Sequence, residues 1–516
     1  MSAQRVGFVV GALALVASIF LPPPAGMERE AFIVAGLVVL MAAWWMTEAI
    51  PLTATALMPF VALPLAGVMD AKATASAYYA PILFLLLGGA FIALAIERTG
   101  LHRRLSLAIL KLVGASIRLP QRSSRLLLAV TIAVALFSLL LFNNWISIIV
   151  LAGATMVVAG LALSAPEKLL FAFMTSAAIL SMLISNTSTA LIMMPMALAV
   201  IAGAGIGKKD QDGLAGALPM GIAFAASIGG LGTIVGSPTN GIAVALLDEM
   251  TGLKISFVDW MAYGLPVVLV GVPLATFIIS RVQHVNEHHF DVATARAAID
   301  DHAPWTRAEK RLLPVIAITF ALWMSQRWVA PLLPKGSWED GTIAIIASLV
   351  LFILPDGTGR PMLKWKEADR APWGVIMMFG GGLALAAGMQ ASGLADWLGQ
   401  ALLPLDAFPL IMVALAIVAM VVLITEFASN VATASGIIPV VASLVVALGV
   451  DPVLLAMPAA LAASWGFMLP AGTGPNAIAW STGRIRIERM VGAGLALDII
   501  GIFLIVGIVW SVAVFV

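Results

Sequence analysis

The stretch ISNTSTALIMMP, from Ile184 to Pro195, decides the fold of this chain. It lies in a segment that carries no charge from Leu169 to Gly207, yet five polar residues follow one another from Ser185 to Thr189. In lipid, an unpaired backbone polar group costs several kcal/mol, so non-helical backbone at membrane depth is tolerated only where protein or a water-filled cavity shields it. We therefore predict that this stretch forms the tip of a re-entrant hairpin.

Three other segments carry related signals. TEFASNVATASGIIP, from Thr425 to Pro439, repeats the Ser-Asn pattern, and its Asn430 follows Asn186 by 244 positions. IVGSPTN (Ile234 to Asn240) and PAGTGPN (Pro470 to Asn476) place Gly and Pro inside apolar sequence, which predicts breaks in two helices. Freed helix N-termini attract anions, and freed carbonyl and hydroxyl oxygens ligate hard cations such as sodium. Together the four segments predict a joint anion and cation site.

The composition restricts the protein to the membrane. Of the 516 residues, 61% are hydrophobic and 11% are charged, against about 25% charged in soluble domains. Apolar segments long enough for a hydrocarbon core of about 30 Å recur along the chain, so we expect an all-α polytopic membrane protein. The absence of cysteine excludes disulfides, thiolate metal sites and thiol catalysis, and a net charge of +1 gives no reason to expect nucleic acid as a partner. No HExxH motif or Ser/His/Asp set lies at membrane depth, so we expect no enzyme.

The basic residues predict the orientation. Cytoplasmic loops carry an excess of Lys and Arg, and much of the Lys and Arg of this chain lies in residues 98–125, 281–311 and 358–370. Four spans near 6–21, 31–50, 53–69 and 81–97 then place the N-terminus in the cytoplasm, and the last span ends in the periplasm. The natural compartment is the inner membrane of a bacterium.

Internal similarity indicates two related halves. FLLLGGAFIALAIERTGL (84–101) resembles IMMFGGGLALAAGMQASGL (376–394), and AWWMTEAIP (43–51) resembles ALWMSQRWVAP (321–331). The tips and the breaks form two further pairs in the same order. Transporters often contain such repeats in inverted topology with the substrate between them, so we predict an inverted repeat.

At these residues the chain resembles the divalent anion/sodium symporter family, which contains bacterial dicarboxylate transporters and eukaryotic citrate carriers. The resemblance rests on WWMTEAIP, LGG…ERTGLHRR, SMLISNTSTALIMMP, IGGLGTIVGSPTN, TEFASNVATAS and FMLPAGTGPNAI, which span nearly the whole chain. It implies a homodimer in which a transport domain moves like an elevator against a scaffold domain. It also implies sodium as the co-transported ion, with no organic cofactor.

The resemblance and the repeat together divide the chain into six parts. These are first-half scaffold spans (1–125), an inserted apolar hairpin-like segment (126–163), the first-half transport domain (164–280), a cytoplasmic loop between the repeats (281–311), second-half scaffold spans (312–400) and the second-half transport domain (401–516). The expected tips lie at 185–187 and 429–431, and the expected breaks at 236–240 and 472–476.

The same resemblance implies the site residues. The first sodium ion is expected at Ser181, Ser185, Asn186 and backbone near Gly236, and the second at Thr425, Ser429, Asn430 and backbone near Gly472. The substrate is expected to meet Asn186, Thr187, Ser237, Asn430, Val431 and Pro475.

Two features depart from the family pattern. Val431 replaces the hydroxyl residue of a Ser-Asn-Thr tip, and a lost hydrogen bond of this kind is worth about 0.5 to 1.5 kcal/mol. This leaves the choice among succinate, malate and citrate open. The stretch from Leu126 to Leu163 is an apparent insertion in which Asn143 aligns with Asn186 at an offset of 43, and we expect Asn143 and Asn144 to serve packing.

The charges sharpen the leading hypothesis of sodium-coupled di- and tricarboxylate symport. No Lys or Arg occurs in 169–207, 214–247 or 407–482, so a bound dianion needs helix dipoles and co-bound cations for compensation. The alternatives are a sodium-independent exchanger or a sulfate transporter of the same architecture, and a channel. Glu426 leaves proton coupling open, and Glu48 either serves function or holds a helix end.

Overall fold

The computed structural model describes residues 2–114, 145–207, 210–287 and 304–514, and within these ranges every regular element is a helix. An isolated bridge between Pro355 and Pro361 is the only β pairing there. In this described part, nine helices are long and apolar enough to cross a membrane. They are α1 (Ala3–Phe20), α2 (Arg29–Thr47), α6 (Ile82–Thr99), α11 (Asn186–Gly203), α14 (Phe257–Val282), α16 (Arg307–Val329, continued by η2, Ala330–Leu332), α19 (Trp373–Ala391), α22 (Asn430–Leu448) and α25 (Ile487–Ala513). The all-α polytopic membrane fold expected from the sequence is confirmed.

The first spans match the prediction except in one place. Helices α1, α2 and α6 lie where spans were expected, and the apolar segment predicted as one span at 53–69 is divided in two. Two short helices, α3 (Leu52–Thr55) and α4 (Met58–Leu65), stand there instead. Pro59 explains the interruption, because it has no N–H to bond the carbonyl of Thr55 and is favoured in the first turn of a new helix.

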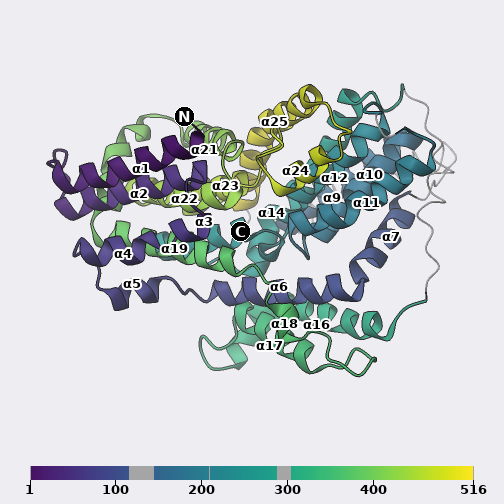
Figure 1. Ribbon diagram of the computed structural model, residues 1–516, viewed down its shortest axis with the longest axis horizontal. Coiled ribbons are helices and arrows are strands. Elements are labelled where there is room, and N and C mark those ends of the chain that lie inside the picture. Colours follow the sequence, from purple (N-terminus) through teal and green to yellow (C-terminus); the bar gives the residue numbers. More distant parts are fainter. Residues whose placement is uncertain (1, 115–144, 208–209, 288–303, 515–516) are drawn as a thin grey trace.

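Helix α6 runs across the molecule, with α16, α17 (Asp340–Ile353) and α18 (Trp365–Ala368) along one side of it (Figure 1). A Cβ on Gly88 would lie 2.6 Å from the Cβ of Ala344, so the missing side chain lets α17 approach closely. The Ser348 hydroxyl donates to the Gly88 carbonyl over 3.3 Å, and the ring of Phe91 meets the ring of Phe352 edge-on at 5.7 Å. Gly100, with φ of 78°, ends α6, and α7 (Leu101–Gly114) then turns away from it (Figure 1).

A charged cluster fastens the end of α6 to the segment that follows α17. Arg98 pairs with Asp356 and donates to the carbonyl of Met362, and Arg360 pairs with Glu367 over 2.5 Å. Burial alone would raise the pKa of Asp356, but hydrogen bonds from Thr358 and Arg98 outweigh it and lower that pKa to about 2. The cluster therefore depends on an ionised carboxylate.

The rest of the molecule contains two hairpins and two broken helices. The first hairpin joins α10 (Ala165–Ser181) to α11, and the second joins α21 (Leu410–Thr425) to α22. The first broken helix comprises α12 (Leu214–Gly230), η1 (Ile234–Gly236) and α13 (Pro238–Thr251), and the second comprises α23 (Pro452–Ala462) and α24 (Gly474–Ser481). The remaining elements are α5 (Ala71–Ala77), α9 (Trp145–Ala162), α20 (Leu394–Leu402) and η3 (Leu403–Ala407).

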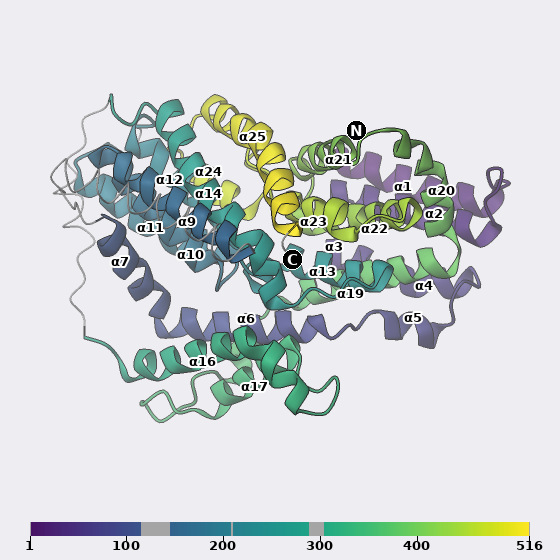
Figure 2. The same cartoon turned by 180° about the vertical axis from the view of Figure 1, so that it is seen from behind.

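The broken helices cross over between the hairpins. Helix α13 packs against α22 and α23, whereas α24 packs against α11 and α12. Both views of the ribbon show α24 beside α12, although the two helices are far apart in the sequence (Figures 1 and 2). Each hairpin is thus packed against a helix that belongs to the broken helix of the other half.

Much of the segment predicted as an insertion at 126–163 lies outside the described residues, as do Asn143 and Asn144. Its last part is α9, which packs against α14. Residues 288–303 of the predicted loop between the repeats also lie outside the described ranges. The six-part division of the chain stays a prediction.

Candidate functional site

The first tip is the start of α11. The Ser185 side chain accepts a hydrogen bond from the backbone N–H of Ser188 over 3.2 Å and thereby caps this helix. A serine cap satisfies one of the N–H groups that a helix start leaves free. Asn186 and Thr187 consequently occupy the first turn, where further backbone N–H groups have no helical partner. The polar run in the sequence is therefore a helix N-terminus inside a hairpin.

Oxygen atoms gather around the side chain of Asn186. Its Oδ1 lies 2.7 Å from the Ser181 hydroxyl, which also donates to the Ala226 carbonyl over 2.6 Å. Reversing the Asn186 amide makes its nitrogen the donor to the carbonyls of Ala226 (3.2 Å) and Gly236 (3.1 Å). A Cβ on Gly230 would lie 2.2 Å from Asn186 Oδ1, so a glycine is needed there. This pocket of oxygens suits a donor or a small hard cation.

The second tip repeats the arrangement. Ser429 caps α22 by accepting from the backbone N–H of Ala432 over 3.2 Å. The Thr425 hydroxyl lies 2.9 Å from Asn430 Oδ1 and donates to the Ala463 carbonyl over 2.8 Å. Thr425 and Ser181 are each the last residue of the first arm of their hairpin and make corresponding bonds.

Asparagine side chains hold both helix breaks. Asn240 Nδ2 donates to the carbonyls of Gly230 (2.7 Å) and Thr233 (2.8 Å), and Asn476 Nδ2 donates to the carbonyl of Leu469 (3.1 Å). Their amide oxygens are buried and have no hydrogen-bond partner among the described residues. The helices resume at Pro238 and Gly474, inside the predicted ranges.

The non-helical backbone starts earlier than the ranges 236–240 and 472–476 predict. It begins after Gly230 in the first break, apart from the short η1, and after Ala462 in the second. The sequence signals, Pro and Asn, mark where each helix restarts and not where the previous one ends.

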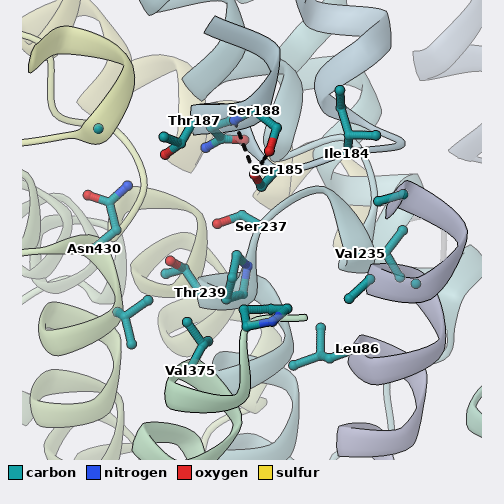
Figure 3. Close-up of a pocket in the computed structure, with 18 of the residues that line it drawn as sticks. Leu86, Ile184, Ser185, Thr187, Ser188, Val235, Ser237, Thr239, Val375 and Asn430 are labelled. Carbon is teal, nitrogen blue, oxygen red and sulfur yellow. Dashed lines mark hydrogen bonds between the residues drawn. The ribbon is translucent and has the colours of Figure 1, made fainter. Parts of the chain in front are cut away.

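Both tips and both breaks open on one cavity of about 460 Å³. Ser237 lies below the first tip and Asn430 on the facing wall (Figure 3). Nine of the twelve predicted site residues line it: Ser185, Asn186, Thr187, Ser237, Ser429, Asn430, Val431, Gly472 and Pro475. The other three, Ser181, Gly236 and Thr425, are buried and do not line it; the two hydroxyls lie against the tip asparagines.

The two halves touch at the cavity. A Cβ on Gly474 would lie 2.5 Å from Thr187 Oγ1, so the start of α24 approaches the first tip closely. Four helix N-termini, those of α11, α13, α22 and α24, therefore reach the cavity lining at Asn186, Pro238, Asn430 and Gly474. Each contributes a partial positive charge and free N–H groups.

The remaining wall comes from one face of α6 and the start of α19. Leu86, Gly89, Ala93 and Glu97 line the cavity at helical spacing, and Arg370 faces Glu97 with an N–O distance of 2.7 Å. These two are the only charged residues of the lining within the described chain. Sequence reasoning missed Arg370 because it looked for basic residues close in sequence to the tips.

Two acids considered from the sequence have other positions. Glu426 is fully buried, and its carboxylate accepts from the backbone N–H groups of Met468 and Leu469, each over 3.0 Å. It thus supports the second break from behind and does not line the cavity. Glu48 ends α2 in a left-handed conformation with φ of 49°, which favours the helix-end interpretation.

Known proteins are similar in sequence to this chain along nearly its whole length. The sodium-dependent dicarboxylate transporter SdcS of Staphylococcus saprophyticus is 33% identical over 521 residues, covering 98% of this chain and 91% of the relative. The protein of the same name from Staphylococcus aureus is also 33% identical, with coverage of 99% and 91%. A family model described as "Sodium:sulfate symporter transmembrane region" matches residues 3–147 and 154–516. The resemblance found in the sequence is confirmed, and this chain belongs to the sodium:sulfate symporter transmembrane family.

Proposed function

We propose that this chain is a secondary active transporter that carries di- or tricarboxylates of the succinate, malate and citrate class together with sodium ions. The observation that carries the proposal is the pair of equivalent hairpin tips on one cavity, each with an asparagine held by a hydroxyl. The names of the relatives, sodium-dependent dicarboxylate transporters, support the same substrate class.

The sodium sites are proposed behind the tips. At the first, the Ser181 hydroxyl, the Asn186 side-chain oxygen and the Gly236 carbonyl would ligate the ion, with Ser185 capping the helix beside them. At the second, Thr425 and Asn430 take the corresponding places, with Ser429 and the backbone near Gly472. Neutral oxygen ligands suit a hard monovalent cation, which brings its own positive charge to the site.

The anion is proposed between the tips. Thr187 and Asn430 offer side-chain donors to carboxylate groups, Ser237 and Pro475 complete the walls, and four helix N-termini contribute partial positive charge. Two sodium ions behind the tips would raise the affinity for a dianion through their positive charge. By linkage, the bound anion raises the affinity for sodium by the same factor. This reciprocity is the physical basis of coupling.

The wider arrangement is proposed from the family resemblance and the sequence. A homodimer would hold the scaffold parts fixed in a bacterial inner membrane, with the N-terminus cytoplasmic and the C-terminus periplasmic. The transport parts, with their tips and breaks, would move as a body and expose the cavity to each side in turn.

Sulfate is the second candidate substrate, because the family description names it. A sodium-independent exchanger would use the same cavity without ions behind the tips. Val431, which lacks the hydroxyl expected at the second tip, bears on this choice because it lines the cavity.

The test is uptake of labelled succinate, citrate and sulfate by proteoliposomes of the purified protein. It is measured with and without an inward sodium gradient, and with or without succinate trapped inside. The proposal expects uptake of a carboxylate that needs the sodium gradient and no internal anion. Uptake that needs trapped anion and ignores sodium would identify an exchanger, and uptake of sulfate alone would replace the substrate class.

A further inference from the structure

An ion pair stands at the water-exposed end of the cavity. Glu97 lies in the last turn of α6 and Arg370 in the segment between α18 and α19, and both line the cavity. Their side chains are 35% and 62% exposed, whereas the residues behind the tips are buried. We call this end, defined by Glu97 and Arg370, the mouth of the cavity.

The cavity extends along α6 from the first break to the mouth. Gly89 lies against Val235 of this break, since a Cβ there would lie 2.9 Å from the Val235 side chain. Glu97 follows Gly89 by eight residues, which is about 12 Å along a helix. Between these levels the lining of α6 consists of uncharged residues, and Arg370 carries the one positively charged side chain of the cavity lining in the described chain.

Arg370 is held much more loosely than the arginine beside its partner. Arg98 pairs with Asp356, approaches Glu367 at 3.6 Å and donates to a backbone carbonyl, and its side chain is 21% exposed. Arg370 has Glu97 as its carboxylate partner in the described chain, and both are exposed to water. Exposed single ion pairs contribute little to stability, so exchanging Glu97 for another carboxylate costs little.

We propose that Arg370 forms a peripheral carboxylate site at the mouth, where an incoming or departing di- or tricarboxylate replaces Glu97 as the partner of the guanidinium. This rests on the proposed function and adds to it a step outside the tips. A guanidinium binds a carboxylate through two parallel N–H donors, which suits a brief first contact. Glu97 competes for the same donors and keeps the anion from being retained there.

This arrangement predicts a kinetic effect confined to one side of the membrane. The guanidinium of Arg370 attracts anions to the mouth and offsets their repulsion by Glu97, and salt screens the effect. It changes the substrate concentration needed for half-maximal uptake and leaves the rate of the carrier motion unchanged. Under the orientation predicted from the basic loops, the mouth faces the cytoplasm.

The experiment measures initial rates of labelled succinate uptake by inside-out membrane vesicles, at low ionic strength and with added choline chloride. At low ionic strength, Arg370→Gln should raise the half-saturating succinate concentration about three- to tenfold, with the maximal rate and the sodium dependence retained. Arg370→Lys should restore most of the affinity, and Glu97→Gln should lower the half-saturating concentration. Added salt should weaken affinity in the wild type and not in Arg370→Gln.

Lys366→Gln is the matched control, because it removes the same charge from an exposed residue of the neighbouring helix α18 that does not line the cavity. An equal effect of Lys366→Gln, or an unchanged affinity in Arg370→Gln, would overturn the peripheral site. The proposed transport function would still stand if the wild type takes up succinate in either case. A wild type that takes up none of succinate, citrate and sulfate would remove the proposed function itself, and the peripheral site with it.

Discussion

The Thr425 hydroxyl lies 2.9 Å from the side-chain oxygen of Asn430, and the Ser181 hydroxyl lies 2.7 Å from that of Asn186. In both hairpins the hydroxyl residue ends the first arm and the asparagine opens the second. At the first tip the Ser181 hydroxyl and the carbonyls of Ala226 and Gly236 surround the Asn186 amide, and at the second the Thr425 hydroxyl lies against Asn430. The geometry makes these pairs the first place to test the site.

Replacing either tip asparagine should abolish transport. Asn186→Ala and Asn430→Ala remove a side chain that both faces the cavity and closes the oxygen cluster, so we expect sodium-dependent succinate uptake to fall to the level of empty liposomes. Thermal unfolding followed by tryptophan fluorescence should show that both variants remain folded. Near-normal uptake by either purified variant would remove the site assignment.

Changing the hydroxyl behind the second tip should affect sodium most. Thr425→Val keeps the shape but loses the oxygen, and we expect the sodium concentration for half-maximal uptake to rise about tenfold, equivalent to about 1.4 kcal/mol. Thr425→Ser keeps the oxygen and serves as the control, since Ser181 stands at the corresponding place in the first hairpin. If Thr425→Val and the wild type show the same sodium dependence, Thr425 does not ligate the ion.

Adding a hydroxyl at the second tip should alter the choice of substrate. Val431→Thr places a hydrogen-bonding group in the cavity lining, worth about 0.5 to 1.5 kcal/mol where it meets a partner. Competition of unlabelled malate, citrate and sulfate against labelled succinate should show a changed order of preference, with sodium dependence nearly retained. Val446→Thr, at an exposed position of the same helix, should leave the order unchanged. An identical preference profile in Val431→Thr would place residue 431 outside the substrate contact.

The cluster at the end of α6 should make stability depend on pH. The pKa of Asp356, about 2, lies below its ordinary value of 3.8, so its contribution is fully present above about pH 4 to 5 and is lost as the pH falls toward 2. We expect Asp356→Asn to lower the unfolding temperature of detergent-solubilised protein by a few degrees at pH 7, and the difference from wild type to shrink below pH 4. Asp369→Asn, at an exposed position, is the control. A difference that stays constant down to pH 3 would contradict the role of the ionised carboxylate.

Two adjacent glycines of α6 should respond differently to the same substitution. Gly88→Ala forces a methyl group onto the backbone of Ala344 and should lower the unfolding temperature. Gly89→Ala meets the side chain of Val235 in the first break, so its main effect should be a slower maximal rate of uptake. Equal effects of the two variants on stability and on rate would contradict this prediction. The contact of Gly88 with α17 and the contact of Gly89 with the first break would then not differ in function.

The serine caps at the two tips follow from signals that are local in the sequence. A serine before an asparagine can cap a helix without help from distant residues, and Ser185 and Ser429 do so. The extent of the breaks and the pair Glu97–Arg370 could not be predicted in this way. Both depend on which segments meet in space, and Arg370 lies 60 residues before Asn430 along the chain. A charge in a basic loop gives no sign, by itself, that it borders a cavity.

The crossing of α24 onto the first hairpin has a consequence for how the chain is made. Gly474, whose helix covers the first tip, is synthesised 288 residues after Asn186. At about 5 to 20 residues per second, roughly 15 s to 1 min passes between the two. During that interval Thr187 lacks its neighbour from α24, whereas Asn186 already has its partners Ser181, Ala226 and Gly236. A chain that ends before α24 would therefore leave the Thr187 side of the first tip without its cover.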